Sequence, residues 1–337
     1  MIPYFHFDPI SVIPGTIEFH VFGILVGTGV LMGSWLAQKR AAQVGLNNRV
    51  VADLALWIVL VSFFFAHQVS LFAYFPERVF GDPCQFATDC MIGGEQFVCK
   101  SSGRCSNGSW LEVLNIASGI SSYGGFLGAF IALWSFFKLK RIRVIPGIID
   151  LTGGKGRPAL RYLDVMTQGF AVGWFWGRMG CFTAHDHIGK ASDFFLAVNF
   201  PDGFRSGVPA IAAIGAEGFT PRFDLGFLEM LYTIPLIAFF YLWANKRDDL
   251  RPGFYCAVMV LTYAPYRFFL DAMRATDISG ADRRYFSSLF EPGLTPGQIG
   301  SILILFLGLW LWWLGGRAMK DPSIMSYRDA DEELEQA

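Results

Sequence analysis

The sequence predicts an all-α integral membrane protein with seven transmembrane helices, an outside N-terminus and a cytoplasmic C-terminus. Of its 337 residues, 53% are hydrophobic and 16% are charged, whereas an ordinary soluble domain is about 25% charged. The mean hydropathy is +0.41, so the chain has more apolar surface than one water-soluble core buries. The apolar residues also form long uncharged stretches, and a stretch of roughly 18 to 20 residues is enough to cross a bilayer.

Seven predominantly apolar stretches follow one another, and we treat residues 1–337 as a single membrane domain. The first ten residues contain no Lys or Arg, so we expect no cleaved signal peptide. The predicted transmembrane helices cover residues 17–37, 51–75, 113–137, 162–181, 227–244, 254–273 and 299–314.

The positive charges predict the orientation of these helices. The connections after the first, third and fifth helices, together with the tail, hold 16 of the 27 Lys and Arg residues. The alternate connections are longer and hold eight. Because Lys and Arg are enriched in cytoplasmic loops, the first set is expected in the cytoplasm, including the tail at 318–337. The protein is then expected in the inner membrane of a bacterium, with the segments 76–112 and 182–226 on the periplasmic side.

Four cysteines lie in the first of these outer segments, with the spacing C-x5-C-x8-C-x5-C. The periplasm is oxidising, so two disulfides are expected, with three pairings open. The alternative is a four-cysteine zinc site, which usually has closer C-x2-C steps. Cys181 and Cys256 lie in or beside apolar stretches and are expected to be buried thiols. The disulfide candidates are Cys84, Cys90, Cys99 and Cys105.

Arg178 lies near the outer end of the fourth helix, between Gly177 and Gly180. Ionisable side chains inside a membrane are costly and often functional. The two glycines leave room for a large headgroup to approach the guanidinium. The alternative is an arginine that extends toward the lipid headgroups at the helix end.

Arg267, Asp271 and Arg274 in the sixth helix have the spacing i, i+4, i+7 and therefore share one helix face. Asp271 is able to pair with either arginine. Arg267 lies several apolar residues from the outer end, which favours a polar cavity inside the helix bundle over a position facing lipid.

Three further polar groups are candidates. Glu229 is a possible counter-ion for an arginine, or a carboxylate at the outer interface. His20 is a possible proton acceptor, or simply a histidine at a helix end. The tripeptide 185–187, His-Asp-His, resembles a metal ligand set, but we expect a solvated loop and no metal site.

The arginines point to the ligand class. Arginine binds phosphate through two parallel hydrogen bonds and stays charged in a low dielectric. A phospholipid headgroup is therefore the predicted ligand, and the net charge of −1 together with the absence of a nucleic-acid motif argues against nucleic acid.

The order of motifs resembles the prolipoprotein diacylglyceryl transferase family over about residues 7–314. The segment 177–189, GRMGCFTAHDHIG, resembles the family signature Gly-Arg-x-Gly-Asn-x-x-Asn-x-Glu-x-x-Gly. Further similar steps follow the same order along the chain: His20-x-x-Gly23, Ser122-Tyr123-Gly124-Gly125, Pro221-Arg222 followed by Glu229, Tyr266-Arg267 to Asp277, and Pro296-Gly297-Gln298-Ile299.

The chain departs from the family pattern mainly at hydrogen-bonding groups. Tyr123 stands at the histidine of the family's His-Gly-Gly motif, and Phe22 at a tyrosine. Cys181 and Ala184 replace two asparagines, and Asp186 replaces a glutamate. The segment 66–68, Ala-His-Gln, stands where the family has Gly-Gly-Arg in its second helix. The family's His-Pro-x-Gln stretch before Glu229 is missing here. The cysteine-bearing segment resembles an insertion.

The resemblance implies transfer of the diacylglyceryl group of phosphatidylglycerol to the lipobox cysteine of a prolipoprotein signal peptide, forming a thioether. It implies phospholipid binding by Arg178, Arg274, Gly177, Gly180 and Glu229. The catalytic candidates are Arg267, Tyr123 and His20, with solvent as a further proton acceptor. No cofactor is expected.

Two other functions were weighed against the transferase. A catalytically silent relative would bind phospholipid or lipoprotein precursor without turnover. A transporter is disfavoured because no pair of interrupted helices occurs in repeated halves.

Overall fold

A computed structural model describes residues 1–8, 10–13, 17–82, 84, 91–92, 95–96, 98–99, 104–115, 119–145, 148–202, 218–247, 249–277, 285–287 and 293–320. A helix occupies each of the seven predicted ranges. These helices are α1 (Val21–Gln43), α2 (Asn48–Val69), α4 (Ser122–Phe136), α5 (Ala159–Ala184), α6 (Leu225–Ala238), α7 (Phe254–Ala272) and α8 (Pro296–Ala318).

Four helices within the described residues are long and apolar enough to cross a membrane. They are α1, α8, α2 with its π-helical extension to Tyr74, and α6 with its continuation to Lys246. The apolar stretch in α4 is shorter, Tyr123–Phe136. Charged residues lie within α5 and α7, including Arg178 and Arg267, and these lower their apolar character. The chain is thus mostly helical and has the character of a membrane protein.

Two details of the predicted fold were wrong. The third predicted helix starts at Ser122 rather than at 113, because Ser109 caps a separate 3-10 turn, Trp110–Leu114. The description all-α also omits small sheets in the hydrophilic connections, where backbone groups outside the helices pair with one another.

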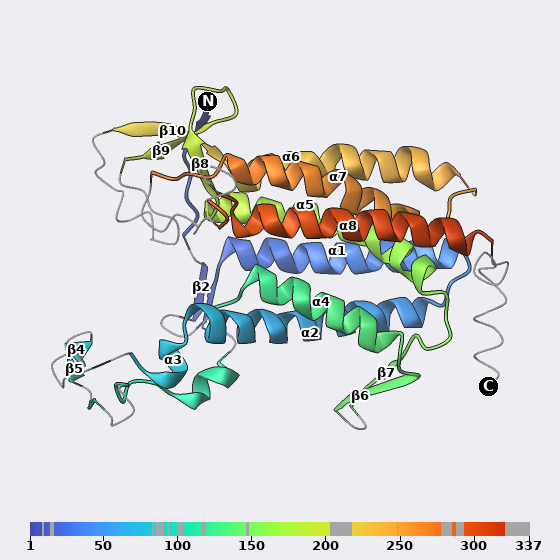
Figure 1. Ribbon diagram of the computed structural model, residues 1–337, viewed down its shortest axis with the longest axis horizontal. Coiled ribbons are helices and arrows are strands. Elements are labelled where there is room, and N and C mark those ends of the chain that lie inside the picture. The colour runs from blue at the N-terminus through green and yellow to red at the C-terminus, as the bar shows by residue number, and fades with distance from the viewer. Residues whose placement is uncertain are drawn as a thin grey trace. The chain divides into compact units, whose positions relative to one another are not determined.

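The chain forms two compact units. The first contains residues 1–48 and 158–337, and the second contains residues 49–157. In the first unit, α5 packs against α1, α6 and α7, and α8 packs against α7 (Figure 1). The closest packing joins α1 to α5, where Gly29 and Gly33 face Gly173 and Gly169. Paired G-x3-G steps let helix backbones approach one another in a membrane.

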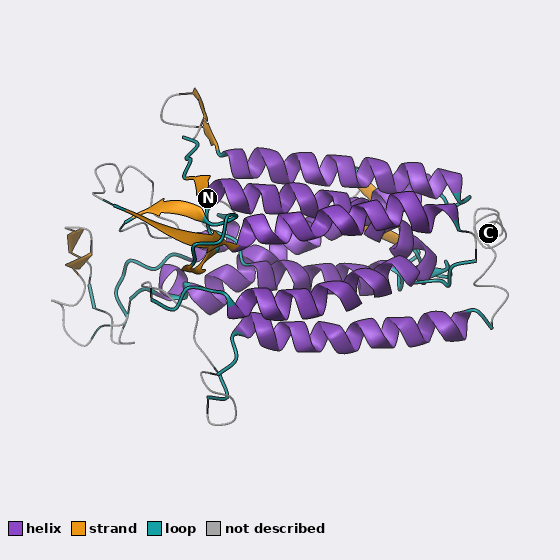
Figure 2. Ribbon diagram, turned by 90° about the horizontal axis from the view of Figure 1, so that it is seen from above, coloured by secondary structure: helices purple, strands orange, loops and turns teal. Residues whose placement is uncertain are grey.

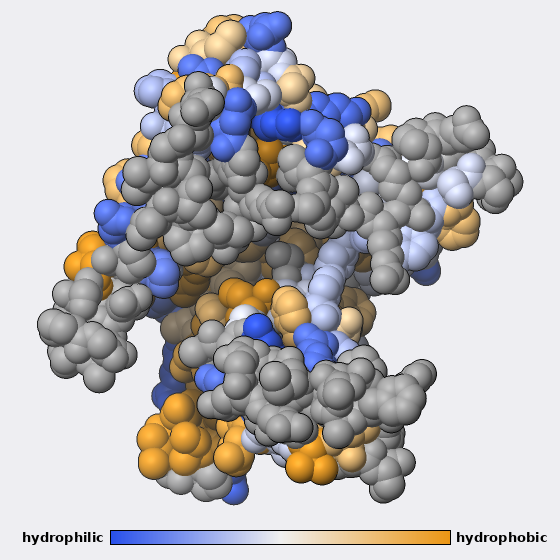
Figure 3. Space-filling view, turned by 90° about the vertical axis from the view of Figure 1, so that its left-hand side faces the viewer, coloured by the Kyte–Doolittle hydropathy of each residue, from blue (hydrophilic) through white to orange (hydrophobic). Residues whose placement is uncertain are grey.

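Strands gather at one end of the helices of this unit (Figure 2). A four-stranded sheet has the order β1 (Ile2–Pro3), β9 (Val198–Pro201), β10 (Phe219–Asp224) and β8 (Ile188–Ala191). A hairpin joins β2 (Ile10–Ile13) to β3 (Ile17–Phe19). The upper part of Figure 3, where the sheet lies, is rich in hydrophilic residues (blue). The N-terminal segment and the segment 182–226, both predicted to be periplasmic, contribute strands at this same end of the helices.

Local sequence explains how the helices of the first unit begin. Thr295 and Gln298 form a capping box at the start of α8, with Pro296 in its first turn. Asp224 accepts a hydrogen bond from the amide of Phe227 at the start of α6. Inside α6, Pro235 has no N–H to donate, and the helix continues as the π-helical turn Phe239–Trp243.

The second unit contains α2 and α4, the short helix α3 (Glu77–Phe80), and two hairpins. The hairpins pair β4 (Met91–Ile92) with β5 (Glu95–Gln96), and β6 (Arg141–Ile145) with β7 (Ile149–Thr152). A disulfide joins Cys84 to Cys99, which confirms that this segment is stabilised by disulfide bonding. Cys105 is also disulfide-bonded, and Cys90 lies outside the described residues.

Candidate functional site

Glu229 in α6 binds two arginines from neighbouring helices. Its Oε1 lies 3.1 Å from Nη2 of Arg178 in α5, and its Oε2 lies 2.9 Å from Nη1 of Arg267 in α7. The hydroxyl of Tyr263 donates a hydrogen bond of 2.5 Å to Oε1. Glu229 is fully buried, and a buried carboxylate persists in its charged form only when it is paired in this way. Glu229 is therefore a counter-ion inside the protein and not an interfacial carboxylate.

Aromatic side chains hold Arg178 in place. Its guanidinium lies over the ring of Trp174, 4.5 Å from the ring centroid, and Trp174 packs edge-on against Tyr263. The same guanidinium lies 3.6 Å from Sγ of Cys181. Trp174 lies four positions before Arg178, and Tyr263 lies four positions before Arg267. Positions i and i+4 lie on one helix face, so each ring is on the same face as its arginine.

Asp271 gathers the other end of the cluster. Its Oδ1 lies 3.3 Å from Nη2 of Arg267 and 2.9 Å from Nε of Arg274. The hydroxyl of Thr295 donates a hydrogen bond to its Oδ2. Gly297 lies so close that a Cβ there would be 2.8 Å from the carboxylate. The start of α8 therefore packs directly on Asp271, and only glycine fits at this contact.

Among the described ion pairs of this cluster, arginines outnumber carboxylates. Three arginines, Arg178, Arg267 and Arg274, share two buried carboxylates. Each arginine remains partly accessible, with 14%, 14% and 23% of its side chain exposed. Partly exposed guanidinium groups provide hydrogen-bond donors for an additional anion.

The predicted solvated loop at 185–187 was wrong for His185, whereas Asp186 and His187 are partly exposed. His185 is buried, its Nδ1 lies 2.7 Å from Oδ2 of Asp224, and its Nε2 lies 3.0 Å from the carbonyl oxygen of Phe5. Burial raises the pKa of Asp224, and the hydrogen bond to His185 partly offsets this increase. The histidine is thus a structural link between the end of α5, the start of α6 and the N-terminal segment.

His185 also has a left-handed backbone, with φ of 49°. Only a few per cent of residues other than glycine adopt positive φ. The chain therefore turns back after α5, and Asp186 and His187 lie over its last turn, with their side chains 38% and 21% exposed. Nδ1 of His187 lies 2.5 Å from Oδ1 of Asp186.

The remaining predicted residues lie elsewhere. His20 precedes α1 and is exposed. Tyr123 lies in α4 of the second unit and is 48% exposed. A Cβ at Gly177 would meet no atom within 4 Å, whereas one at Gly180 would lie 3.1 Å from the ring of Phe22. Gly180 therefore allows α1 to pack against α5.

Sequence reasoning missed Trp174, Tyr263 and Thr295 as parts of this cluster. The first two carried a usable signal, since each lies one helical turn before an arginine. Thr295 lies 24 residues from Asp271 along the chain, and nothing in the sequence relates the two.

The chain is similar in sequence to curated proteins of one name. The chain is 24% identical over 321 residues to a phosphatidylglycerol–prolipoprotein diacylglyceryl transferase of Nitratidesulfovibrio vulgaris, covering 94% of this chain and 97% of that protein. A protein of the same name from Gloeobacter violaceus is 22% identical over 317 residues, covering 94% and 96%. One from Ruegeria pomeroyi is 29% identical over 206 residues, covering 59% and 63%.

The family model described as prolipoprotein diacylglyceryl transferase matches residues 9–314. This range includes every helix of both units except the last residues of α8. The chain therefore belongs to the prolipoprotein diacylglyceryl transferase family.

Proposed function

We propose that this protein transfers the diacylglyceryl group of phosphatidylglycerol to the lipobox cysteine of a prolipoprotein. The observation that carries the proposal is the buried cluster in which Glu229 binds both Arg178 and Arg267, while both guanidinium groups stay partly accessible. Family membership and the names of the relatives supply the reaction class.

In the proposed reaction, the sulfur of the acceptor thiolate attacks the glycerol carbon that carries the phosphate. A C–S bond forms, the C–O bond breaks, and glycerol 1-phosphate leaves with the electron pair. Arg178 and Arg267 hold the phosphate and stabilise the negative charge that develops on the leaving oxygen. Arg274 adds a third cation near the same anion, and Glu229 keeps the two principal guanidinium groups in position.

We also propose the setting of this reaction. All seven helices cross a bacterial inner membrane, with the N-terminus and the small strands of the first unit on the periplasmic side. The distribution of Lys and Arg over alternate connections supports this orientation. The arginine cluster lies toward the same end of its helices as the strands, since β10 leads directly into α6 and Gly189, in β8, pairs with Arg274.

The thiol proton needs an acceptor. His20 and Tyr123 are the proposed groups, and substituting each by Phe tests them separately. If Tyr123 stands at a position that has merely lost its histidine, Tyr123→His is expected to raise the rate of transfer.

The deciding experiment uses purified protein, phosphatidylglycerol vesicles and a lipobox peptide, with mass spectrometry of the peptide product. The wild-type protein is expected to yield a diacylglyceryl thioether. Arg178→Ala is expected to lower the rate by about a hundredfold or more, the usual cost of losing a donor to a developing oxyanion.

Arg222→Ala is the matched control, because Arg222 is paired with the exposed Asp277 outside the cluster. It is expected to keep nearly full activity. Binding of phosphatidylglycerol that depends on Arg178, without product under any condition, would support a silent relative instead of the enzyme.

A further inference from the structure

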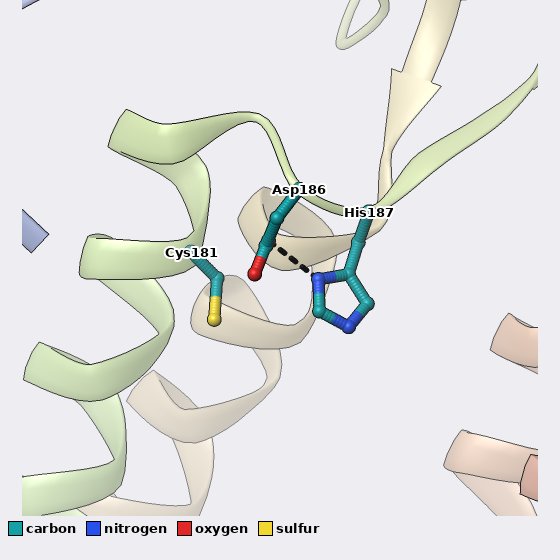
Figure 4. Close-up of side chains that lie close together, drawn as sticks. All are labelled: Cys181, Asp186 and His187. Atoms are coloured by element: carbon teal, nitrogen blue, oxygen red, sulfur yellow. Dashed lines mark hydrogen bonds and ion pairs between the residues drawn. The ribbon is translucent and has the colours of Figure 1, made fainter. Parts of the chain in front are cut away.

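Three side chains of types that can coordinate metals lie close together beside the arginine cluster. Cys181 in the last turn of α5, Asp186 and His187 each offer one ligand atom, and these atoms lie within 4.8 Å of one another. Figure 4 shows the Cys181 side chain and the Asp186 carboxylate on the same side of the turn, with His187 hydrogen-bonded to Asp186. Cys181 is buried, whereas the other two are partly exposed.

The kind of donor atoms limits the metal. A thiolate, an imidazole and a carboxylate are together typical ligands of Zn²⁺, whereas Mg²⁺ and Ca²⁺ prefer oxygen alone. With Zn–S of about 2.3 Å and Zn–N of about 2.0 Å, tetrahedral ligand atoms lie about 3.5 Å apart. Donor atoms within 4.8 Å of one another therefore need to move by only about an ångström to bind one ion.

The surrounding residues fix the site before any metal binds. His185 holds the reversed chain through Asp224 and the Phe5 carbonyl, so that Asp186 and His187 follow a fixed turn. On the other side, the start of α6 packs on Cys181, because a Cβ at Gly226 would lie 3.0 Å from its Cβ. Outer-shell contacts of this kind orient metal ligands.

The charges are also compatible with a cation. Arg178 lies 3.6 Å from the sulfur of Cys181 and would repel a bare divalent ion. One thiolate and one carboxylate carry two negative charges, which balance a divalent ion, so the loaded site is itself neutral next to Arg178. The proton of Cys181 leaves when the metal binds.

We propose that Cys181, Asp186 and His187 bind one zinc-class divalent transition metal ion, with a fourth position open to solvent or to a thiol. The proposed role of the open position rests on the proposed transferase function: an ion held by Cys181, Asp186 and His187 would offer a fourth ligand position to the sulfur of the acceptor cysteine.

The test is a Co²⁺ titration of metal-free protein in detergent, without reductant so that the disulfides stay closed. Co²⁺ reports thiolate coordination through a charge-transfer absorption band. The wild-type protein is expected to bind one equivalent with such a band. Cys181→Ser is expected to abolish the band, and His187→Ala to weaken binding at least tenfold. Cys256→Ser is the matched control, since Cys256 is the other free cysteine among the described residues, and its band is expected to be unchanged.

A lipobox peptide tests the open position without requiring turnover. Adding it to the Co²⁺ protein is expected to intensify the thiolate band, whereas a peptide with serine in place of its cysteine is expected to have no effect. A band that survives Cys181→Ser, or no saturable binding to a wild-type protein that unfolds cooperatively, would overturn the site. Failure of the transfer assay alone would overturn the proposed function and leave the metal site standing.

Discussion

At the scale of single residues, the site depends on carboxylates that each serve two arginines. Glu229 joins α5 to α7, and Asp271 joins two arginines of the α7 region to the start of α8. In each case the carboxylate is almost fully buried, so its pairing is a condition of folding as well as of ligand binding. The arginines keep some exposure because their side chains are long enough to reach the edge of the cluster.

Replacing Glu229 by Gln is expected to destabilise the protein. The change preserves size but leaves two buried guanidinium groups without their shared counter-ion, a loss typically worth about 3 kcal/mol or more. The free energy of unfolding, measured in detergent by chemical denaturation, is the readout. Asp277→Asn is the control, since Asp277 is exposed and pairs with Arg222 at the surface, where such pairs contribute about 1 kcal/mol or less. Equal effects of the two substitutions would contradict the assignment of Glu229.

At the scale of secondary-structure elements, the contact between α1 and α5 is made by backbone more than by side chains. A Cβ at Gly33 would lie 2.8 Å from the carbonyl oxygen of Gly169, and one at Gly29 would lie 2.7 Å from that of Gly173. Side chains give way easily, but helix backbones do not. The position of α5, and with it Arg178, therefore depends on these glycines.

Gly29→Ala and Gly33→Ala are each expected to lower the apparent Tm, because the added methyl group forces α1 away from α5. Gly27→Ala, in the same helix, is the matched control, since a Cβ there would meet no atom within 4 Å. It is expected to be neutral or stabilising by up to about 1 kcal/mol, the helix propensity difference between Gly and Ala. Thermal unfolding in detergent compares the three, and a Tm loss in Gly27→Ala as large as in Gly33→Ala would refute the packing argument.

A surface ion pair links β10 to the residues after α7. Arg222 and Asp277 form two hydrogen bonds, one of them 2.5 Å long. The hydrogen bond with Arg222 lowers the pKa of Asp277, and the same bond raises the pKa of Arg222. The carboxylate pKa is lower in the folded state than in the unfolded state, where it is about 3.9. The pair therefore stabilises the folded state at pH values above about 3.9, and this stabilisation is lost as the pH falls through the pKa of the folded state.

The stability difference between wild-type protein and Asp277→Asn is therefore expected to be small and constant near neutral pH, and to disappear in acid below about pH 4. Because Asp277 is mostly exposed, the difference is expected to be about 1 kcal/mol or less. Thermal unfolding of both proteins between pH 3 and pH 7 measures it. A difference that grows in acid would mean that the pair does not act as described.

At the scale of the whole molecule, the sequence predicted the elements better than their contacts. Hydropathy located a helix at each of the seven ranges, because predominantly apolar stretches of this length have few other solutions in a membrane protein. The spacing of Arg267, Asp271 and Arg274 predicted their shared face. The partnership of Glu229 with Arg178 and Arg267 depends on how three helices pack, and no local pattern encodes that geometry. His185 was missed because its partners, Asp224 and Phe5, lie 39 and 180 residues away.

The last prediction concerns the outer loop and the orientation of the chain together. Cys84 and Cys99 are joined and Cys105 is also disulfide-bonded, so the loop should contain no free thiol and should face the oxidising side. In a Cys181→Ser, Cys256→Ser background, an impermeant maleimide applied to spheroplasts is expected to label the loop only after reduction.

The substitution Lys246→Cys, in a connection predicted to be cytoplasmic, is expected to give labelling only after permeabilisation. Labelling of the loop without reductant would contradict two disulfides. The orientation would be reversed if the loop were labelled only after permeabilisation while Lys246→Cys were labelled without it. The Lys and Arg residues of that connection would then lie outside, against the usual enrichment of Lys and Arg in cytoplasmic loops.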